Sequence, residues 1–148
     1  MPLAVLDLGS NSFHLSVYAA TGSRVVAPRR EEREPVRLGA SLEGGRIDGA
    51  GFARGLAAVA RLVRVLELEE PGCRVVAVAT SAIREAGNGR AFADEVARRH
   101  GVAVEILGGE EEARATFAGA RAFAGAPGRL AVVDLGGGSL EIATGAAT

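Results

Sequence analysis

The fold is decided by the stretch Leu3-Ala4-Val5-Leu6-Asp7-Leu8-Gly9-Ser10-Asn11-Ser12, in which an apolar run ends in an aspartate and a turn of small residues. The run from Leu3 to Leu8 is too short for a helix and predicts a buried strand. A later strand leads into Asp134-Leu135-Gly136-Gly137-Gly138-Ser139, which is identical to residues 7–12 at four of six positions. Two copies of one strand-and-turn pattern predict a duplicated fold whose second copy has only begun.

Between the two turns, hydrophobic periodicity predicts alternating strands and helices. Strands are expected over residues 3–8, 13–20, 24–36, 75–79, 102–107, 130–133 and 140–143. Helices are expected from a cap at Asp48 to Pro71, around Phe92 and Val96 as far as Gly101, and over residues 110–124. Loops or turns are expected at 21–23, 39–49, 87–89 and 127–128. The order β-β-β-α-β-α-β-α, followed by β-β, predicts an α/β fold with a mixed sheet flanked by helices.

Composition limits the kind of protein. The chain has 148 residues, of which 48% are hydrophobic, enough for one ordinary core. Its 17 basic residues, all arginine, and 18 acidic residues give a net charge of -1, so no general attraction to nucleic acid or to a membrane is expected. The single Cys73 excludes an internal disulfide. With no signal peptide and no run of roughly 20 apolar residues, the sequence predicts a soluble, cytoplasmic protein.

The two small-residue turns are candidate phosphate loops. The missing side chain at Gly9 lets backbone N–H groups point at a phosphate, and Ser10, Asn11 and Ser12 can donate from their side chains. Residues 136–139 offer a second such loop. A plain hairpin turn is the alternative for either loop alone, but matched strand contexts, each with an aspartate, favour phosphate binding. Asp7 and Asp134 then end buried strands, where a carboxylate is costly without a cation.

Five segments resemble the exopolyphosphatase and guanosine pentaphosphate phosphatase (Ppx/GppA) family, within the superfamily of acetate kinase, sugar kinases, Hsp70 and actin. They are Val5 to His14, Val36-Arg37-Leu38-Gly39, Ala79 to Ala86, Gly109 to Arg114 and Val133 to Glu141. The resemblance implies two ribonuclease-H-like lobes around a phosphate cleft. It places a complete first lobe at residues 1–126 and the opening β-hairpin of an incomplete second lobe at 127–148.

The resemblance also implies roles for individual residues. Glu112, which precedes Ala113-Arg114 in its block, would be the base that activates the attacking water, with Glu111 as the alternative. Arg84 would grip a terminal phosphate, against the alternative of a surface ion pair near Glu85. Binding of Mg²⁺ or Mn²⁺ is implied for Asp7, Asp134 and Glu141. Phosphate binding is assigned to Gly9, Ser10, Asn11, Ser12, Arg37, Gly136, Gly137, Gly138 and Ser139.

Other charged residues are interpreted structurally. Arg29, Arg30 and Arg33 alternate with glutamates, which is ordinary for an exposed edge strand, although they could extend a track for a long polyanion. His14 and His100 are isolated in the sequence, which favours core or surface placement over metal ligation.

The expected function is Mg²⁺-dependent hydrolysis of a terminal phosphoanhydride, in polyphosphate or in guanosine pentaphosphate, by water attack assisted by a glutamate. The alternatives are a kinase of the same superfamily and a non-catalytic phosphate-binding lobe. Members of the family have a second lobe, and this sequence resembles only its opening hairpin. This short chain is therefore expected to lack full activity. No nucleic-acid or membrane partner is expected, and an unpaired hairpin at residues 130–143 predicts a concentration-dependent homodimer.

Overall fold

The computed structural model describes residues 1–19, 27–124 and 128–146. Its centre is a five-stranded sheet in the order β3-β2-β1-β6-β7. The strands are β1 (Leu3–Leu8), β2 (Ser12–Tyr18), β3 (Arg30–Pro35), β6 (Arg74–Ala79) and β7 (Val104–Ile106). β1, β2 and β3 pair antiparallel, whereas β6 lies parallel to both β1 and β7. The predicted mixed α/β fold is therefore confirmed.

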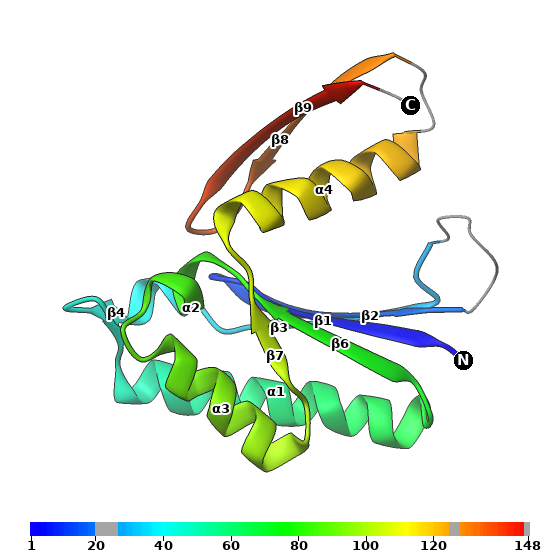
Figure 1. The fold of residues 1–148 in the computed structure, drawn as a ribbon. Coiled ribbons are helices and arrows are strands. Elements are labelled where there is room, and N and C mark those ends of the chain that lie inside the picture. The colour runs from blue at the N-terminus through cyan, green and yellow to red at the C-terminus, as the bar shows by residue number, and fades with distance from the viewer. Residues whose placement is uncertain (20–26, 125–127, 147–148) are drawn as a thin grey trace.

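Helices α1 (Gly49–Glu69) and α3 (Gly89–His100) cover one face of this sheet (Figure 1). α1 begins where the sequence predicts, because the Asp48 carboxylate accepts a hydrogen bond of 2.5 Å from the Gly51 N–H. Alternate residues of β1, namely Ala4, Leu6 and Leu8, are fully buried against these helices. The other face of the sheet, called the cleft face below, carries the polar residues.

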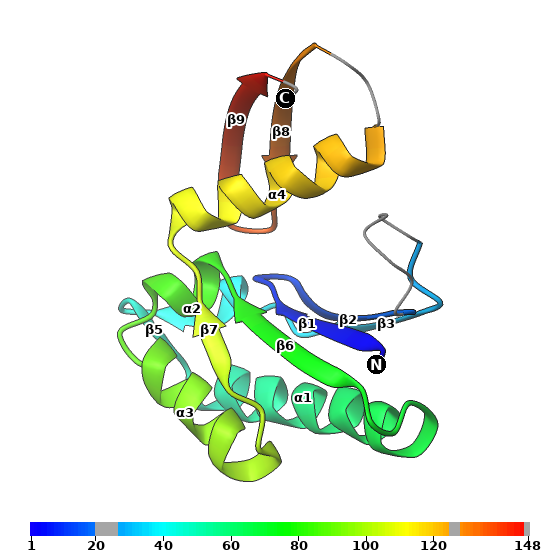
Figure 2. The same ribbon diagram turned by 45° about the vertical axis from the view of Figure 1, so that its right-hand side comes forward.

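α4 (Gly109–Ala124) lies over the cleft face together with the antiparallel hairpin of β8 (Arg129–Leu135) and β9 (Leu140–Ala146) (Figure 2). Gly145 of β9 packs on the ring of Phe117, since a Cβ at this glycine would lie 2.7 Å from the Phe117 Cζ. α4 and the hairpin thus lie on the opposite side of the sheet from α1 and α3 (Figure 1 and Figure 2). The division of the chain into a first lobe and the start of a second lobe at residue 126 stays a prediction. α4 is the element of the first predicted part that contacts the hairpin of the second.

Short elements in two segments of the chain were not predicted. The expected loop over residues 39–49 contains a 3₁₀ turn, η1 (Gly39–Ser41), and a small hairpin of β4 (Leu42–Glu43) and β5 (Arg46–Ile47). Gly44 and Gly45 connect these strands with φ of 55° and 74°, the positive values that a tight two-residue hairpin turn requires. The second is α2 (Ser81–Glu85), which directly follows β6.

Some predictions fall on residues outside the described ranges. These are the last residue of the strand over 13–20, the turn at 21–23, the first part of the strand over 24–36, and the division between residues 126 and 127. Within the described ranges, no helix is long and apolar enough to cross a membrane.

Candidate active site

A cavity of about 460 Å³ lies between the cleft face and the layer formed by α4 and the hairpin. Most of the residues predicted to act on phosphate line it, and they come from both small-residue loops, from β1, from β8 and from α4. They are Asp7, Gly9, Ser10, Asn11, Ser12, Glu112, Asp134, Gly136, Gly137 and Ser139. The predicted residues that do not line it are Arg37, Arg84, Glu111, Gly138 and Glu141.

Asp7 lies near two other carboxylates in this cavity, those of Glu112 and Asp134. Asp7 lies on β1, and its Oδ1 is buried with no hydrogen-bond partner among the described residues. Burial raises the pKa of Asp7, the nearby charges of Glu112 and Asp134 raise it further, and His14 acts in the opposite direction. The orphaned oxygen beside two other carboxylates is a place where a cation would lower the free energy of the site.

The donor set fits a hard cation such as Mg²⁺, because Asp7 and Asp134 offer carboxylate oxygens at one cavity. Thr116 donates a hydrogen bond of 3.0 Å from Oγ1 to the Asp134 Oδ2, which orients that carboxylate. The described residues contain no group of three close ligands, but Mg²⁺ is usually held by one or two carboxylates and completes its shell with water. Glu141 lies across the hairpin from Asp134 in register, outside the cavity lining.

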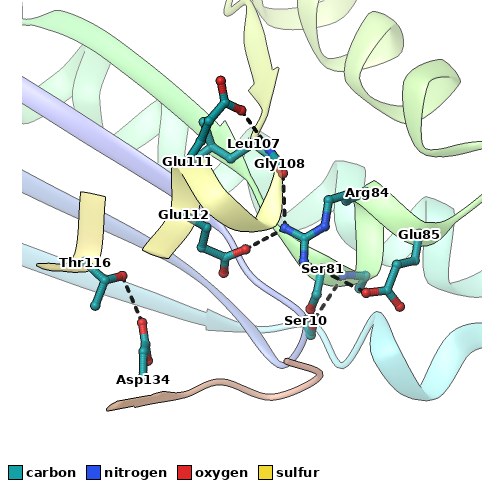
Figure 3. Close-up of polar contacts among 11 residues, drawn as sticks. Ser10, Ser81, Arg84, Glu85, Leu107, Gly108, Glu111, Glu112, Thr116 and Asp134 are labelled. Atoms are coloured by element: carbon teal, nitrogen blue, oxygen red, sulfur yellow. Dashed lines mark hydrogen bonds and ion pairs between the residues drawn. The ribbon is translucent and has the colours of Figure 1, made fainter. Parts of the chain in front are cut away.

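Arg84 holds the carboxylate of Glu112 (Figure 3). Its Nη1 donates to the Glu112 Oε2 at 2.6 Å and to the Leu107 carbonyl at 3.1 Å, while Nη2 lies 3.9 Å from the Glu85 Oε1. The Arg84 and Glu112 side chains are 23% and 13% exposed, so this is a partly desolvated ion pair. Arg84 therefore meets Glu112 here, with Glu85 as a distant second partner.

The two candidate glutamates of α4 do different things. The Glu111 Oε2 accepts a hydrogen bond of 2.8 Å from the Gly108 N–H, which caps the start of the helix. Glu112 instead faces the cavity beside Asp7. A helix turns successive side chains by about a quarter-turn or more, so only one of the two neighbours reaches the cavity.

In the first loop, two hydroxyls are engaged within the chain. Ser10 Oγ lies 2.6 Å from Ser81 Oγ and accepts from the Ala82 N–H at 3.1 Å. Ser12 Oγ lies 2.8 Å from His14 Nε2 and accepts from Arg33 Nε at 3.2 Å. These bonds fix the shape of the loop, and they leave Asn11 as its exposed polar side chain.

The second loop lies directly against the first. A Cβ at Gly137 would be 2.4 Å from the Asn11 Nδ2, and one at Gly138 would be 2.9 Å from the Ser10 Oγ and 3.0 Å from the Ser81 Oγ. Both positions thus need glycine because the loops touch. The turn is closed by a bond of 3.0 Å from the Gly136 N–H to the Ser139 carbonyl.

Arg37 stands beside the first loop but outside the cavity. Its N–H donates to the Asn11 carbonyl at 2.8 Å, and its side chain is exposed. It has a φ of 54°, the left-handed region that favours glycine. A strained residue held next to a candidate site is a reason to test it for function.

The sequence did not point to several residues that line the cavity. Thr116 lies one helical turn after Glu112, so i,i+4 spacing predicts its position once Glu112 is chosen. His14 is two residues after Ser12 on β2 and pairs with Asp7 of β1, which places it on the cleft face. The other lining residues outside the prediction are Val5, Val78, Thr80, Ser81, Leu107 and Ala115.

The fold and the site define a class: a ribonuclease-H-like lobe whose small-residue loops and carboxylates share one cavity. A family model described as the Ppx/GppA phosphatase family matches residues 19–148. The chain belongs to the Ppx/GppA phosphatase family.

Known members show how much of such a protein is present. Exopolyphosphatase 1 of Mycobacterium tuberculosis is 34% identical over 98% of this chain and 42% of its own length, and that of Mycobacterium leprae is 34% identical over 43% of its length. The solved Ppx/GppA family member of Aquifex aeolicus is 30% identical, with a TM-score of 0.86, over 99% of this chain and 47% of its own. An exopolyphosphatase structure from Cytophaga hutchinsonii is 27% identical, with a TM-score of 0.87. The chain thus spans less than half the length of these relatives.

Proposed function

We propose that this chain is the phosphate-binding part of a two-lobed, Mg²⁺-dependent phosphoanhydride hydrolase. Its reaction would release the terminal phosphate of inorganic polyphosphate or of guanosine pentaphosphate. The observation that supports the proposal is that Asp7, Glu112 and Asp134 line one cavity. Residues of both small-residue loops line the same cavity. The similarity to proteins named exopolyphosphatase favours polyphosphate as the substrate.

In this proposal, Glu112 accepts the proton of the attacking water. Its carboxylate is held by Arg84 and lies near Asp7, so its direction is fixed before substrate arrives. A Mg²⁺ ion held by Asp7 and Asp134 supplies charge neutralisation of the phosphoryl oxygens when bound. The side chains of Asn11 and Ser139 line the cavity and can donate to those oxygens.

Arg84 acts first as a positioning residue, since its guanidinium contacts Glu112 and the Leu107 carbonyl. A guanidinium has five N–H donors, so a phosphate oxygen can be bound while Nη1 stays on Glu112. Arg84 would then keep its expected phosphate contact and also pair with Glu112, instead of the surface ion pair near Glu85 that was the alternative.

The experiment compares phosphate release by this chain and by a version extended through the second lobe, on polyphosphate and on guanosine pentaphosphate. We expect release by the extended protein, because a second wall is needed to exclude water from the site. Glu112→Gln should lower its turnover by at least about 100-fold while substrate still binds. Glu111→Gln is the matched control and should keep turnover, since Glu111 caps the helix.

Near-normal turnover of Glu112→Gln would refute the assignment of the base. Full activity of the short chain would refute the need for a second lobe. A non-catalytic phosphate-binding lobe predicts phosphate binding without release in both versions. A kinase predicts ATP affinity that depends on the adenine and transfer of phosphate to an acceptor.

A further inference from the structure

A row of three side chains crosses the cleft face from the carboxylate site to the edge of the sheet. Asp7 of β1 pairs in register with His14 of β2, and His14 pairs in register with Arg33 of β3. Residues directly opposite one another on paired strands project from the same face. Neighbouring strands are roughly 4.8 Å apart, so the Arg33 backbone is about 10 Å from that of Asp7.

Arg33 differs from the other arginines of its strand region. Arg30 and Glu34 alternate with Arg33 along β3 and form ion pairs with Glu69 and Arg61 of α1, so they face the helical side of the sheet. Arg33 is exposed, and its Nε donates to the Ser12 Oγ of the cleft face. Within the described residues Arg33 forms no ion pair, which leaves its terminal nitrogens available to an anion.

The Arg33 side chain is directed by its neighbours. Ser12 is 6% exposed, and its Oγ lies 3.2 Å from Arg33 Nε and 2.8 Å from His14 Nε2. Ser12 also lines the cavity. The guanidinium is therefore held against the rim of the carboxylate site, and its position does not depend on a carboxylate partner.

The row is asymmetric about Asp7. On the side away from β2, the residues in register are Val78 of β6 and then Glu105 of β7. That side offers an apolar group followed by a negative charge, whereas the β3 side offers an imidazole followed by a guanidinium. Along this row of paired residues, a linear polyanion whose end lies at Asp7 therefore meets a cationic side chain only on the β3 side.

We propose that linear polyphosphate leaves the carboxylate site across β2 and β3, with Arg33 binding phosphates inward from the terminal one. This rests on the proposed function, because it takes the terminal phosphate to lie at Asp7 and the two loops. Arg33 provides a planar fork of N–H donors suited to phosphate oxygens, and Ser12 positions that fork. Chain-length preference then comes partly from this lobe.

The test measures binding of tripolyphosphate and of a long polyphosphate to this chain by titration calorimetry with Mg²⁺ present. Arg33→Ala should weaken binding of the long chain by about tenfold and of tripolyphosphate by less than about twofold, because only the long chain reaches β3. Arg33→Lys should restore part of the long-chain affinity. Arg30→Ala removes the same charge from the opposite face of the same strand and should change neither affinity.

A second variant keeps the test valid if Arg33→Ala folds poorly. Glu31 is exposed on the same face as Arg33, two residues away on β3 and opposite Ser16 of β2. Glu31→Gln should tighten binding of the long chain by about twofold, because it removes a like charge from the path. An unchanged affinity in Glu31→Gln would count against the path.

The proposal is overturned if Arg33→Ala and Arg30→Ala weaken the binding of long polyphosphate equally. It is also overturned if Arg33→Ala weakens the binding of long polyphosphate and of tripolyphosphate by the same factor. It is also overturned if this chain binds neither probe. Its failure is distinct from failure of the proposed function. Suppose Glu112→Gln stops phosphate release by the extended protein, but Arg33→Ala weakens binding of long polyphosphate and of tripolyphosphate equally. Only the path across β2 and β3 is then wrong. If Arg33→Ala weakens only the binding of long polyphosphate, but Glu112→Gln still releases phosphate normally, only the assignment of the base is wrong.

Discussion

Ser10 and Ser81 place their side-chain oxygens 2.6 Å apart although 71 residues separate them in the sequence. Ser10 Oγ also accepts from the Ala82 N–H, so it joins the loop after β1 to the first turn of α2. α2 carries Arg84, and Arg84 holds Glu112. The serine pair thus connects the first phosphate loop to the proposed catalytic base through buried and partly buried contacts.

Gly138→Ala should disturb this connection, because its Cβ would lie 2.9 Å from the Ser10 Oγ and 3.0 Å from the Ser81 Oγ. We expect the free energy of unfolding to fall by about 1–3 kcal/mol in urea titrations. Combining it with Ser81→Ala should cost less than the sum of the single changes, since removing one hydroxyl makes room. Gly119→Ala on α4 is the control. Its Cβ would meet no atom within 4 Å, and it should stabilise by up to about 1 kcal/mol. A neutral Gly138→Ala would mean that the loops do not touch in solution.

Arg84→Ala should leave the Glu112 carboxylate partly buried beside Asp7 without its cation. We expect a loss of about 1–3 kcal/mol in the free energy of unfolding, and most of it should return in Arg84→Ala/Glu112→Gln because the unpaired charge is gone. Arg90→Ala breaks an exposed pair with Asp94 and should cost less than about 0.5 kcal/mol. Equal losses in the single and double Arg84 variants would show that the ion pair is not the cause.

The order of the long elements follows from local sequence, but the short ones depend on distant contacts. β1 was predicted from its short continuous apolar run, and α1 from its helical apolar spacing and the Asp48 cap, because these signals lie in the local sequence. α2 has five residues, too few to show helical periodicity, and its first turn is fixed by the Ser10 hydroxyl. The β4–β5 hairpin has two residues in each strand, and Gly44-Gly45 is the pattern that marks it.

The same distinction applies to the site. Asp7 and Asp134 could be chosen from the repeated turn, because each ends a strand in the same local context. The hydroxyls of Ser10 and Ser12 could not be assigned, since no local pattern tells whether a loop serine faces a ligand or a residue elsewhere in the chain. His14 and Arg33 join the cleft face only through the register of β1, β2 and β3, which the sequence leaves open.

Asp7→Asn should stabilise the protein. Burial raises the pKa of Asp7 above its usual value of 3.8, so the folded state holds this proton more tightly than the unfolded state. Wild-type stability therefore falls as pH rises from 3.8 through the raised pKa, and the asparagine variant lacks this loss. We expect a gain of about 1 kcal/mol at pH 7 that disappears below pH 3.8, measured by thermal unfolding across pH. A loss of stability at pH 7 would contradict the proposed cost of the Asp7 charge.

Mg²⁺ should reduce the difference in stability between the wild type and Asp7→Asn, since a cation that binds only the folded state raises its stability. The melting temperature of the wild type should rise with Mg²⁺, and that of Asp7→Asn should rise less. Asp94→Asn, on the exposed face of α3, is the control and should respond like the wild type. An equal response of all three proteins would remove Asp7 from the metal site.

Arg37 allows strain and binding to be separated. Its φ of 54° costs an ordinary side chain about 1 kcal/mol, whereas glycine adopts it freely and asparagine tolerates it. Arg37→Gly, Arg37→Asn and Arg37→Ala all remove the charge, so they should weaken polyphosphate binding to the same extent. Their free energies of unfolding should instead rank Gly above Asn above Ala. Equal stability of the three variants would place the strain elsewhere, and unchanged binding would remove Arg37 from the phosphate path.

The outer face of the β8–β9 hairpin should drive self-association of this chain. Val133, Leu135, Leu140 and Ile142 project away from α4, and they are 57% to 80% exposed. Four large apolar side chains on a two-stranded sheet with open edges form a surface that a second copy can cover. Light scattering over a concentration series should show a dimer that Val133→Lys/Ile142→Lys abolishes. Leu68→Lys replaces an equally exposed apolar residue of α1 and should leave the dimer intact, whereas its loss in that control would mean that added charge alone prevents association.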